Sequence, residues 1–223
     1  MSRIYRAPVV ASLKAFFSPL LELPAQGAII SDYLGQLAAK IYRGLQTEGE
    51  HQRALYALFS NYHPAYLGWS TSDLAKASFD LDDCRNLVAK ERGFDDWTAV
   101  EGLGDQRFDP DFEQALQWLL AGELGALKSH LRESPALVHQ RSPYPHEATL
   151  LHYLGSNGLE LWRQQVPFNL VELIRLLLDA GADPAAKMRV YGGAFNTAEL
   201  LGTSAHPAEA GVAEAALLAL EGK

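Results

Sequence analysis

The chain has 223 residues, of which 48% are hydrophobic, and a formal net charge of −8 at pH 7. This length and apolar content exclude a disordered chain and fit a single folded domain, while the acidic charge, without any cluster of Lys and Arg interleaved with aromatics, argues against a nucleic-acid-binding surface. No apolar run reaches the roughly 18 residues of a membrane span, and the only cysteine, Cys84, excludes an internal disulfide and favours a reducing cytoplasm.

Residues 1–28 give the weakest pattern. Basic residues precede the first acidic residue, Glu22, as in some export signals. Lys14, Pro19 and Glu22 interrupt the apolar core that a secretory signal needs, so we expect an ordinary helical start.

Residues 29–66 predict a helix pair, punctuated by Gly49 and Pro64. The apolar residues recur at helical spacing in two groups: Leu34, Leu37, Ala38, Ile41, Tyr42 and Leu45, then Leu55, Leu58 and Phe59. Because no linker separates this pair from the rest, we interpret residues 1–108 as an N-terminal helical cap that includes a degenerate helix pair.

Residues 79–97 predict a capped helix that Gly93 ends, with Phe94 and Trp97 folding back on it. The aspartates 80, 82 and 83 lack the glycine and glutamate of a calcium loop and are interpreted as capping charge on the helix N-terminus. Cys84 lies in this first turn, but the aspartates oppose a lowered thiol pKa, so no reactive thiol is expected.

Residues 109–137 predict a second helix pair. Asp109 is a good N-cap, Pro110 fits the first turn, and Ser134-Pro135 ends the second helix. The apolar residues that recur at helical spacing are Phe112, Ala115, Leu116, Leu119 and Leu120, then Leu124, Leu127, Leu131 and Leu137.

Residues 149–183 carry the most specific motif. The run Thr-Leu-Leu-His-Tyr-Leu-Gly-Ser-Asn-Gly from Thr149 to Gly158 is similar to the opening T-P-L-H-x-A-A-x-x-G of an ankyrin repeat, and Leu-Leu-Leu-Asp-Ala-Gly-Ala-Asp at 176–183 is similar to its ending. The resemblance implies a helix capped by Thr149, a structural His152, a left-handed Gly158, and a second helix from Leu170 to Leu178 that ends before Gly181 and Asp183. It also implies a binding scaffold of stacked helix pairs.

Three repeat frames fit residues 109–223 when a glycine or its substitute falls nine residues after each opening position. The frames are Glu113 to Gly122, Thr149 to Gly158, and Thr197 to His206, at spacings of 36 and 48. Thr149 to Gly181 spans 32 residues where the family has about 21. We therefore expect an 11-residue insertion at 159–169, and a short last helix from about 210 to 220 as a C-terminal cap. The predicted fold class is all-α, an ankyrin-type helical solenoid of about three repeats with an N-terminal helical cap.

A second resemblance precedes these repeats. Ala89 to Trp97 follows the pattern A-x-E-x-G-F-x-x-W, which is similar to a segment in a group of bacterial ankyrin-repeat proteins. This group has no assigned catalytic residues that could be carried over, so the resemblance implies the fold and a bacterial origin and supplies no information on activity.

The predicted partner-binding surface is the concave face of hairpin loops and inner helices. Its candidates come from the finger 141–147, the insertion, and the finger 188–196; they are Tyr144, His146, Trp162, Arg163, Arg189, Tyr191 and Phe195. The alternative is that these aromatics only pack between hairpins. His139 and His146 have no acidic or cysteine partner at ligand spacing, so we expect a solvent-facing loop there and no metal site.

The leading hypothesis is a non-enzymatic, cytoplasmic scaffold that binds a protein partner, with no cofactor, as a monomer or weak oligomer. A narrower version makes the partner a toxin or enzyme that this acidic protein neutralises. The alternatives are an enzyme with a pocket between the N-terminal helices and the repeats, using Cys84 or a histidine, and a self-associating structural module.

Overall fold

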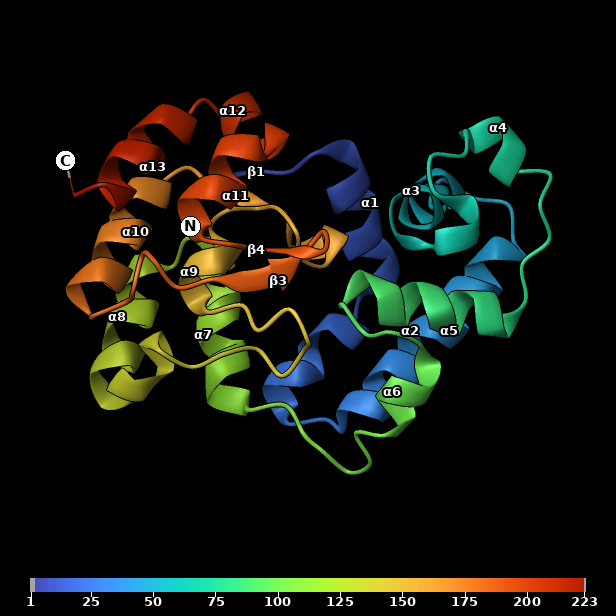
Figure 1. Ribbon diagram of the computed structural model, residues 1–223, viewed down its shortest axis with the longest axis horizontal. Helices are drawn as coiled ribbons and strands as arrows, with labels where there is room; N and C mark the ends of the chain where they lie inside the picture. The colour runs from blue at the N-terminus through green and yellow to red at the C-terminus, as the bar shows by residue number, and fades with distance from the viewer. Residues whose placement is uncertain (1–2, 223) are drawn as a thin grey trace. The chain divides into compact units, whose positions relative to one another are not determined.

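The computed structural model describes residues 3–222 and is mostly helical, with two short two-stranded sheets (Figure 1). The helical class is therefore confirmed. The described residues divide into two compact units, one of residues 8–110 and the other of residues 3–7 together with residues 111–222. The sequence predicted one domain in which the N-terminal helical cap ends and the repeats begin after residue 108. This predicted boundary lies two residues before the observed division.

The unit of residues 8–110 is built from helices. They are α1 (Pro8–Phe17), α2 (Ile30–Leu45), α3 (Gln52–Tyr62), α4 (Thr71–Leu74), α5 (Leu81–Glu91) and α6 (Trp97–Glu101), with 3-10 turns at Leu20–Glu22, Pro24–Gln26 and Pro64–Tyr66. The predicted pair at 29–66 corresponds to α2 and α3. Helix α2 packs on α5 because its buried stripe, which includes Leu34, Leu37 and Ile41, faces that helix.

Helix α5 begins and ends as its sequence predicts. Asp80 and Asp83 form a capping box: each side chain accepts the backbone N–H of the other residue, at 2.8 and 3.0 Å. Gly93 has a φ of +86°, Phe94 folds back to donate its N–H to the Ala89 carbonyl, and the Arg85 guanidinium lies over the Trp97 ring. The aspartates therefore cap a helix.

The second unit contains the remaining elements. They are β1 (Ile4–Tyr5), α7 (Pro110–Ala121), α8 (Leu124–Glu133), α9 (Leu150–Tyr153), β2 (Val166–Pro167), α10 (Leu170–Asp179), β3 (Met188–Val190), β4 (Gly193–Phe195), α11 (Thr197–Thr203), α12 (Ala205–Glu209) and α13 (Ala213–Leu220), with 3-10 turns at Pro135–Val138 and Leu161–Arg163. One apolar core runs through it, and α10 packs on α13 within that core.

The N-terminal strand joins this second unit by pairing with the predicted insertion. β1 lies antiparallel to β2, with Ile4 opposite Pro167. Arg6 donates to the Gln165 side chain at 2.7 Å, and the Arg3 guanidinium lies 4.6 Å from the centre of the Phe168 ring. The insertion is therefore a tertiary element of this unit that the first residues of the chain help to hold.

The helices of the predicted frames agree with the structure in part. α7, α8 and α10 lie where they were predicted, but the middle frame's first helix is only Leu150–Tyr153, since Ser156 adopts a φ of +48° and the chain leaves the helix. The last helix starts at Ala213 because Gly211 has a φ of +74°. The predicted glycine substitute, His206, lies inside α12.

Gly158 is predicted to tolerate no side chain. Its φ is +70°, and a Cβ there would lie 2.9 Å from both methyl carbons of Val190. We expect Gly158→Ala to lower the free energy of unfolding by about 2–3 kcal/mol, through backbone strain plus overpacking. Urea denaturation measures this loss.

Gly211 is the matched control, because its φ is +74° and a Cβ there meets no atom within 4 Å. Gly211→Ala should cost only about 1 kcal/mol. Adding Val190→Ala to Gly158→Ala should bring the loss of unfolding free energy closer to that of Gly211→Ala. If Gly158→Ala and Gly211→Ala lowered the free energy of unfolding equally, the steric explanation would be refuted.

Among the described residues, no helix is both long and apolar enough to cross a membrane.

Candidate functional site

The finger 141–147 contains a turn, in which the N–H of Glu147 donates to the Tyr144 carbonyl at 2.9 Å, and the side chains of alternate residues are buried. Ser142, Tyr144 and His146 are buried, with Tyr144 only 1% exposed. The finger is held on both sides, since the N–H of Ser142 donates to the Ala148 carbonyl and the N–H of Arg189 donates to the His146 carbonyl. The predictions of Tyr144 as a surface anchor and of a solvent-facing loop at His146 are therefore wrong.

The insertion is also buried. Trp162 and Arg163 are 6% and 3% exposed, so the prediction that they lie on a partner-binding surface is wrong. The physical reason is electrostatic: Arg163 Nη2 donates to Glu113 Oε2 at 2.7 Å, and its Nη1 lies 3.4 Å from Glu160 Oε1. Glu160 belongs to the insertion, so the contact with Glu113 on α7 is the one that ties the insertion to the rest of the unit.

Aromatic rings complete this buried cluster around Arg163. The guanidinium carbon lies 4.7 Å from the centre of the Trp162 ring and 5.5 Å from that of Tyr153. Burial opposes the charge of Arg163, but Glu113 and Glu160 outweigh it and raise its pKa well above the usual range. Burial, reinforced by Glu160, raises the pKa of the Tyr153 hydroxyl, so Tyr153 stays neutral.

His146 lies at the edge of this cluster. Its Nδ1 accepts the N–H of Ala148 at 3.1 Å, and its Nε2 lies 3.9 Å from Glu160 Oε2. His139, in contrast, is exposed. Within residues 3–222, no three His, Cys, Asp or Glu side chains are grouped as a metal site requires.

Thr149 and His152 form a local hydrogen-bonded unit. The backbone N–H of Thr149 donates to His152 Nδ1 at 3.1 Å, and His152 Nε2 lies 3.0 Å from the Ala186 carbonyl oxygen. Nδ1 is therefore the acceptor and Nε2 carries the proton. Burial lowers the pKa of His152 to about 4, so this residue is a neutral structural histidine.

We expect His152 to make the fold less stable in acid. Between pH 6.5, the ordinary imidazole pKa, and about 4, the pKa of His152 in the fold, the unfolded chain binds a proton that the folded chain does not. Stability therefore falls as the pH is lowered through this window, by up to about 3 kcal/mol from this residue.

The measurement is urea denaturation at pH 7 and pH 4.5 for the wild type and for His152→Gln, which keeps a donor and an acceptor without titrating. The variant should lose less stability between the two pH values. Other carboxyl and imidazole groups titrate in both proteins and cancel in the comparison; an equal loss in both would disprove the assignment.

The remaining motif residues shape turns. Gly181 has a φ of +99° just after α10. Asp183 accepts the N–H of Ala185 with its side chain at 2.9 Å and that of Ala186 with its carbonyl. This turn places the Ala186 carbonyl against His152, so the two ends of the motif are joined by one hydrogen bond.

The β3–β4 hairpin carries the predicted residues that stay accessible. Tyr191 and Gly192 form its two-residue turn, both with positive φ, and Tyr191 is 66% exposed. The Arg189 side chain is 75% exposed, and Phe195 is half-buried against the core. Of the predicted surface, only this hairpin therefore presents an aromatic ring and a guanidinium to solvent.

Two neighbours that the sequence did not single out support this hairpin. The Tyr191 hydroxyl donates to Asn157 Oδ1 at 2.7 Å, and Arg189 Nε lies 3.6 Å from Glu147 Oε2. Glu147 belongs to the predicted finger 141–147, where it follows a turn and adopts a φ of +53°, and its side chain is 45% exposed. We name the set Glu147, Asn157, Arg189 and Tyr191 the hairpin face.

Cys84 is fully buried in α5. Burial, followed by repulsion from Asp83 and Asp80, raises the pKa of its thiol to about 12. The thiol is therefore protonated at neutral pH, as its sequence environment predicted.

Comparison with known proteins adds no relative: no protein-family model, curated protein or solved structure matches this chain. The ankyrin resemblance therefore stays a prediction from the motif residues.

Proposed function

We propose that this chain is a non-enzymatic module that binds a protein partner through the hairpin face. The observation that carries the proposal is the exposed Tyr191, fixed at a tight turn by its hydrogen bond to Asn157 and placed two residues from an exposed arginine. Tyrosine and arginine dominate interface energies, and a ring that is already positioned loses little conformational entropy on binding.

We further propose that residues 109–223 are an ankyrin-type solenoid in a bacterial cytoplasmic protein, with the preceding residues as its N-terminal helical cap. The succession of α7 and α8, the left-handed Gly122 and Gly158, and the Thr149–His152 unit support the repeat assignment. The insertion is the largest departure from the family pattern, and the buried Arg163 explains how a repeat could accommodate it.

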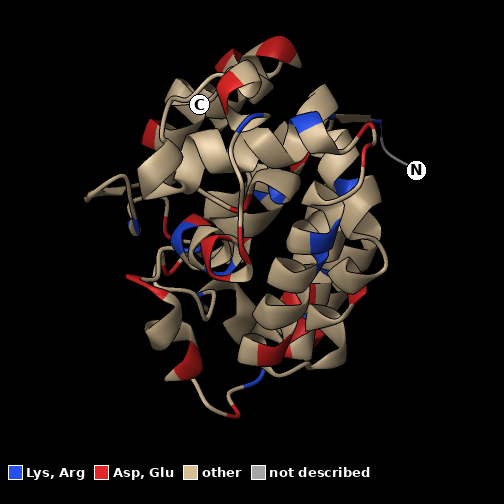
Figure 2. Ribbon diagram, turned by 90° about the vertical axis from the view of Figure 1, so that its right-hand side faces the viewer, with Lys and Arg blue, Asp and Glu red and all other residues tan. Residues whose placement is uncertain are grey.

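The charge favours a basic partner. The formal net charge is −8, and acidic residues occur on many elements of the described ribbon (Figure 2). Complementary charge accelerates association with a basic surface. A basic toxin or enzyme that this chain neutralises is therefore the narrower form of the proposal.

The experiment is affinity capture from the native host lysate, with the wild type beside Arg189→Ala/Tyr191→Ala. Arg175→Ala is the control, because Arg175 is also an exposed arginine, on α10. We expect one stoichiometric protein to be captured by the wild type and the control and lost from the double variant. A partner retained by the double variant would refute the hairpin face.

Two other outcomes separate the alternative functions. A size that grows with concentration on a sizing column, with no captured protein, would support a self-associating module. Turnover of a substrate by the purified chain would support an enzyme.

A further inference from the structure

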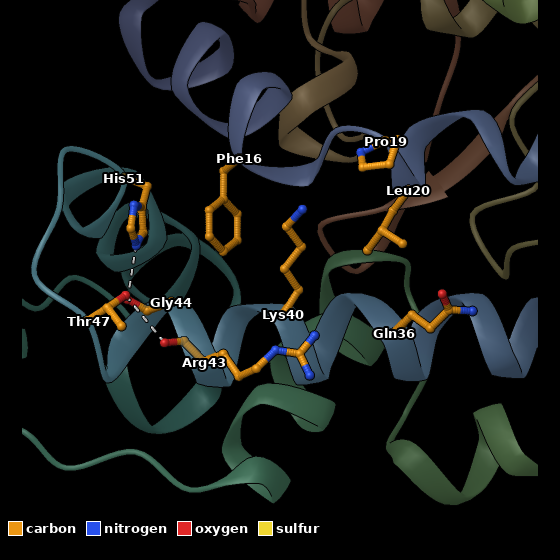
Figure 3. Close-up of a pocket in the computed structure, with 9 residues that line it drawn as sticks. All are labelled: Phe16, Pro19, Leu20, Gln36, Lys40, Arg43, Gly44, Thr47 and His51. Carbon is orange, nitrogen blue, oxygen red and sulfur yellow. Dashed lines mark hydrogen bonds between the residues drawn. The ribbon is translucent and has the colours of Figure 1, made fainter.

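A cavity of about 420 Å³ lies in the unit of residues 8–110, away from the hairpin face in sequence and independent of the proposal above. Figure 3 shows its two walls. Helix α2 forms one wall; Phe16 at the end of α1, with Pro19 and Leu20 that follow this helix, forms the other. Lys40 extends from α2 between Phe16 and Leu20, so its ammonium group lies inside the cavity (Figure 3).

Most of the polar lining comes from one stripe of α2. Gln36, Lys40 and Arg43 follow each other at intervals of four and three residues, which places them on one face of this helix, and Thr47 lies just beyond its end. All four line the cavity. The opposite stripe of α2 holds the core, so the fold fixes where these polar groups point.

Among the described residues, the two cations of this stripe, Lys40 and Arg43, have no carboxylate in ion-pair contact. The cavity lining contains no Asp or Glu, and within residues 3–222 no carboxylate forms an ion pair with Lys40 or Arg43. Lys40 Nζ donates to the Ser18 carbonyl at 2.9 Å, which uses one of its three N–H groups. Burial, together with repulsion from Arg43, lowers the pKa of Lys40. A bound anion would relieve that repulsion.

The apolar wall is also specifically built. The Phe16 ring stacks on His51 at 4.8 Å with an interplanar angle of 21°, and His51 Nε2 lies 3.1 Å from the Gly44 carbonyl oxygen. A Cβ at Gly44 would lie 2.7 Å from Phe16 Cζ. Glycine at this position therefore lets α2 approach Phe16 and brings the flat ring beside the cations.

We propose that this cavity binds a small organic anion, with its carboxylate or phosphate group between Lys40 and Arg43 and its apolar part against Phe16 and Leu20. A guanidinium and an ammonium group three residues apart on a helix suit the oxygens of either head group. The cavity volume is at the lower end of small-molecule sites, which span roughly 300–1,000 Å³. The ligand is therefore a compact anion.

The test is calorimetric titration of the full chain with three probes: inorganic phosphate, phenyl phosphate and benzoate. Phenyl phosphate should bind about tenfold more tightly than inorganic phosphate, because burying the ring adds about 1–2 kcal/mol. Tighter binding of phenyl phosphate than of benzoate would assign a phosphate head group, and the reverse would assign a carboxylate.

Three variants make the result specific. Lys40→Met and the exposed Arg43→Gln should each weaken binding about tenfold, through loss of a charge-assisted hydrogen bond. Arg53→Gln, which removes an exposed charge of the same unit outside the cavity, should bind as the wild type. The absence of binding by all three probes at millimolar concentration would overturn the proposal, as would unchanged affinity in Arg43→Gln, a surface change that leaves the fold intact.

Discussion

Arg163→Met should lower the free energy of unfolding by about 3–5 kcal/mol, the cost of removing one partner from a buried ion pair. Methionine keeps much of the side-chain volume but leaves Glu113 and Glu160 buried without the guanidinium that lies between them. The loss follows from uncompensated charge, and urea denaturation followed by circular dichroism measures it.

The controls for Arg163→Met separate charge from geometry. Arg175→Met, on the exposed side of α10, should change stability by less than about 0.5 kcal/mol. Arg163→Lys keeps the positive charge but loses the planar guanidinium. The loss of unfolding free energy for Arg163→Lys should therefore lie between the losses for Arg163→Met and Arg175→Met. In a double-mutant cycle, Glu113→Gln with Arg163→Met should cost less than the sum of the single changes. A strictly additive result would show that the 2.7 Å contact between Glu113 and Arg163 contributes no coupling.

Substituting the hairpin face should abolish most of the partner affinity. Tyr191→Ala and Arg189→Ala should each weaken binding by about 2 kcal/mol, or roughly 30-fold, as truncated hot-spot residues do. Both side chains are exposed in the described structure, so their removal creates no cavity in the fold. Titration calorimetry with the captured partner measures both losses.

Two further variants test how Tyr191 acts. If the ring of Tyr191 is the anchor, Tyr191→Phe should keep most of the affinity that Tyr191→Ala loses. The phenylalanine variant lacks only the hydrogen bond to Asn157 that positions the ring. Tyr144→Ala should instead lower stability while leaving the affinity of the folded protein unchanged, because Tyr144 is buried. An affinity loss for Tyr144→Ala as large as that for Tyr191→Ala would contradict this division.

Most helices of this fold follow from local patterns in the sequence. The stripe of α2, the capping residues of α5, the Pro110 start of α7 and the leucine run of α10 each contain their own signals of helix start, face or end. The exceptions are helices whose ends are set by the backbone conformation of a single residue. Positive φ at Ser156 and Gly211 shortens two helices, and only the glycine is visible as a signal in the sequence.

The site was less predictable, because burial of its residues depends on distant partners. Glu113, which accepts a hydrogen bond from Arg163, lies 50 residues earlier in the chain. The sequence around Arg163 therefore gives no sign that this arginine is buried. The burial of Ser142, Tyr144 and His146 also had no local signal, because the finger 141–147 is a turn, in which Glu147 adopts a φ of +53°. In α2 the polar spacing of Gln36, Lys40 and Arg43 was visible in the sequence, but the facing wall that makes it a cavity was not.

Photo-crosslinking in the host tests most directly whether the partner binds at the hairpin. A photoreactive residue at Ala194, which is exposed and pairs with Arg189 across the hairpin, leaves Tyr191 and Arg189 intact. The same residue at the exposed positions Leu67 and Leu218 provides the controls. We predict a crosslinked protein at position 194 and none at 67 or 218; a crosslink at either control position with none at 194 would contradict the proposed binding surface.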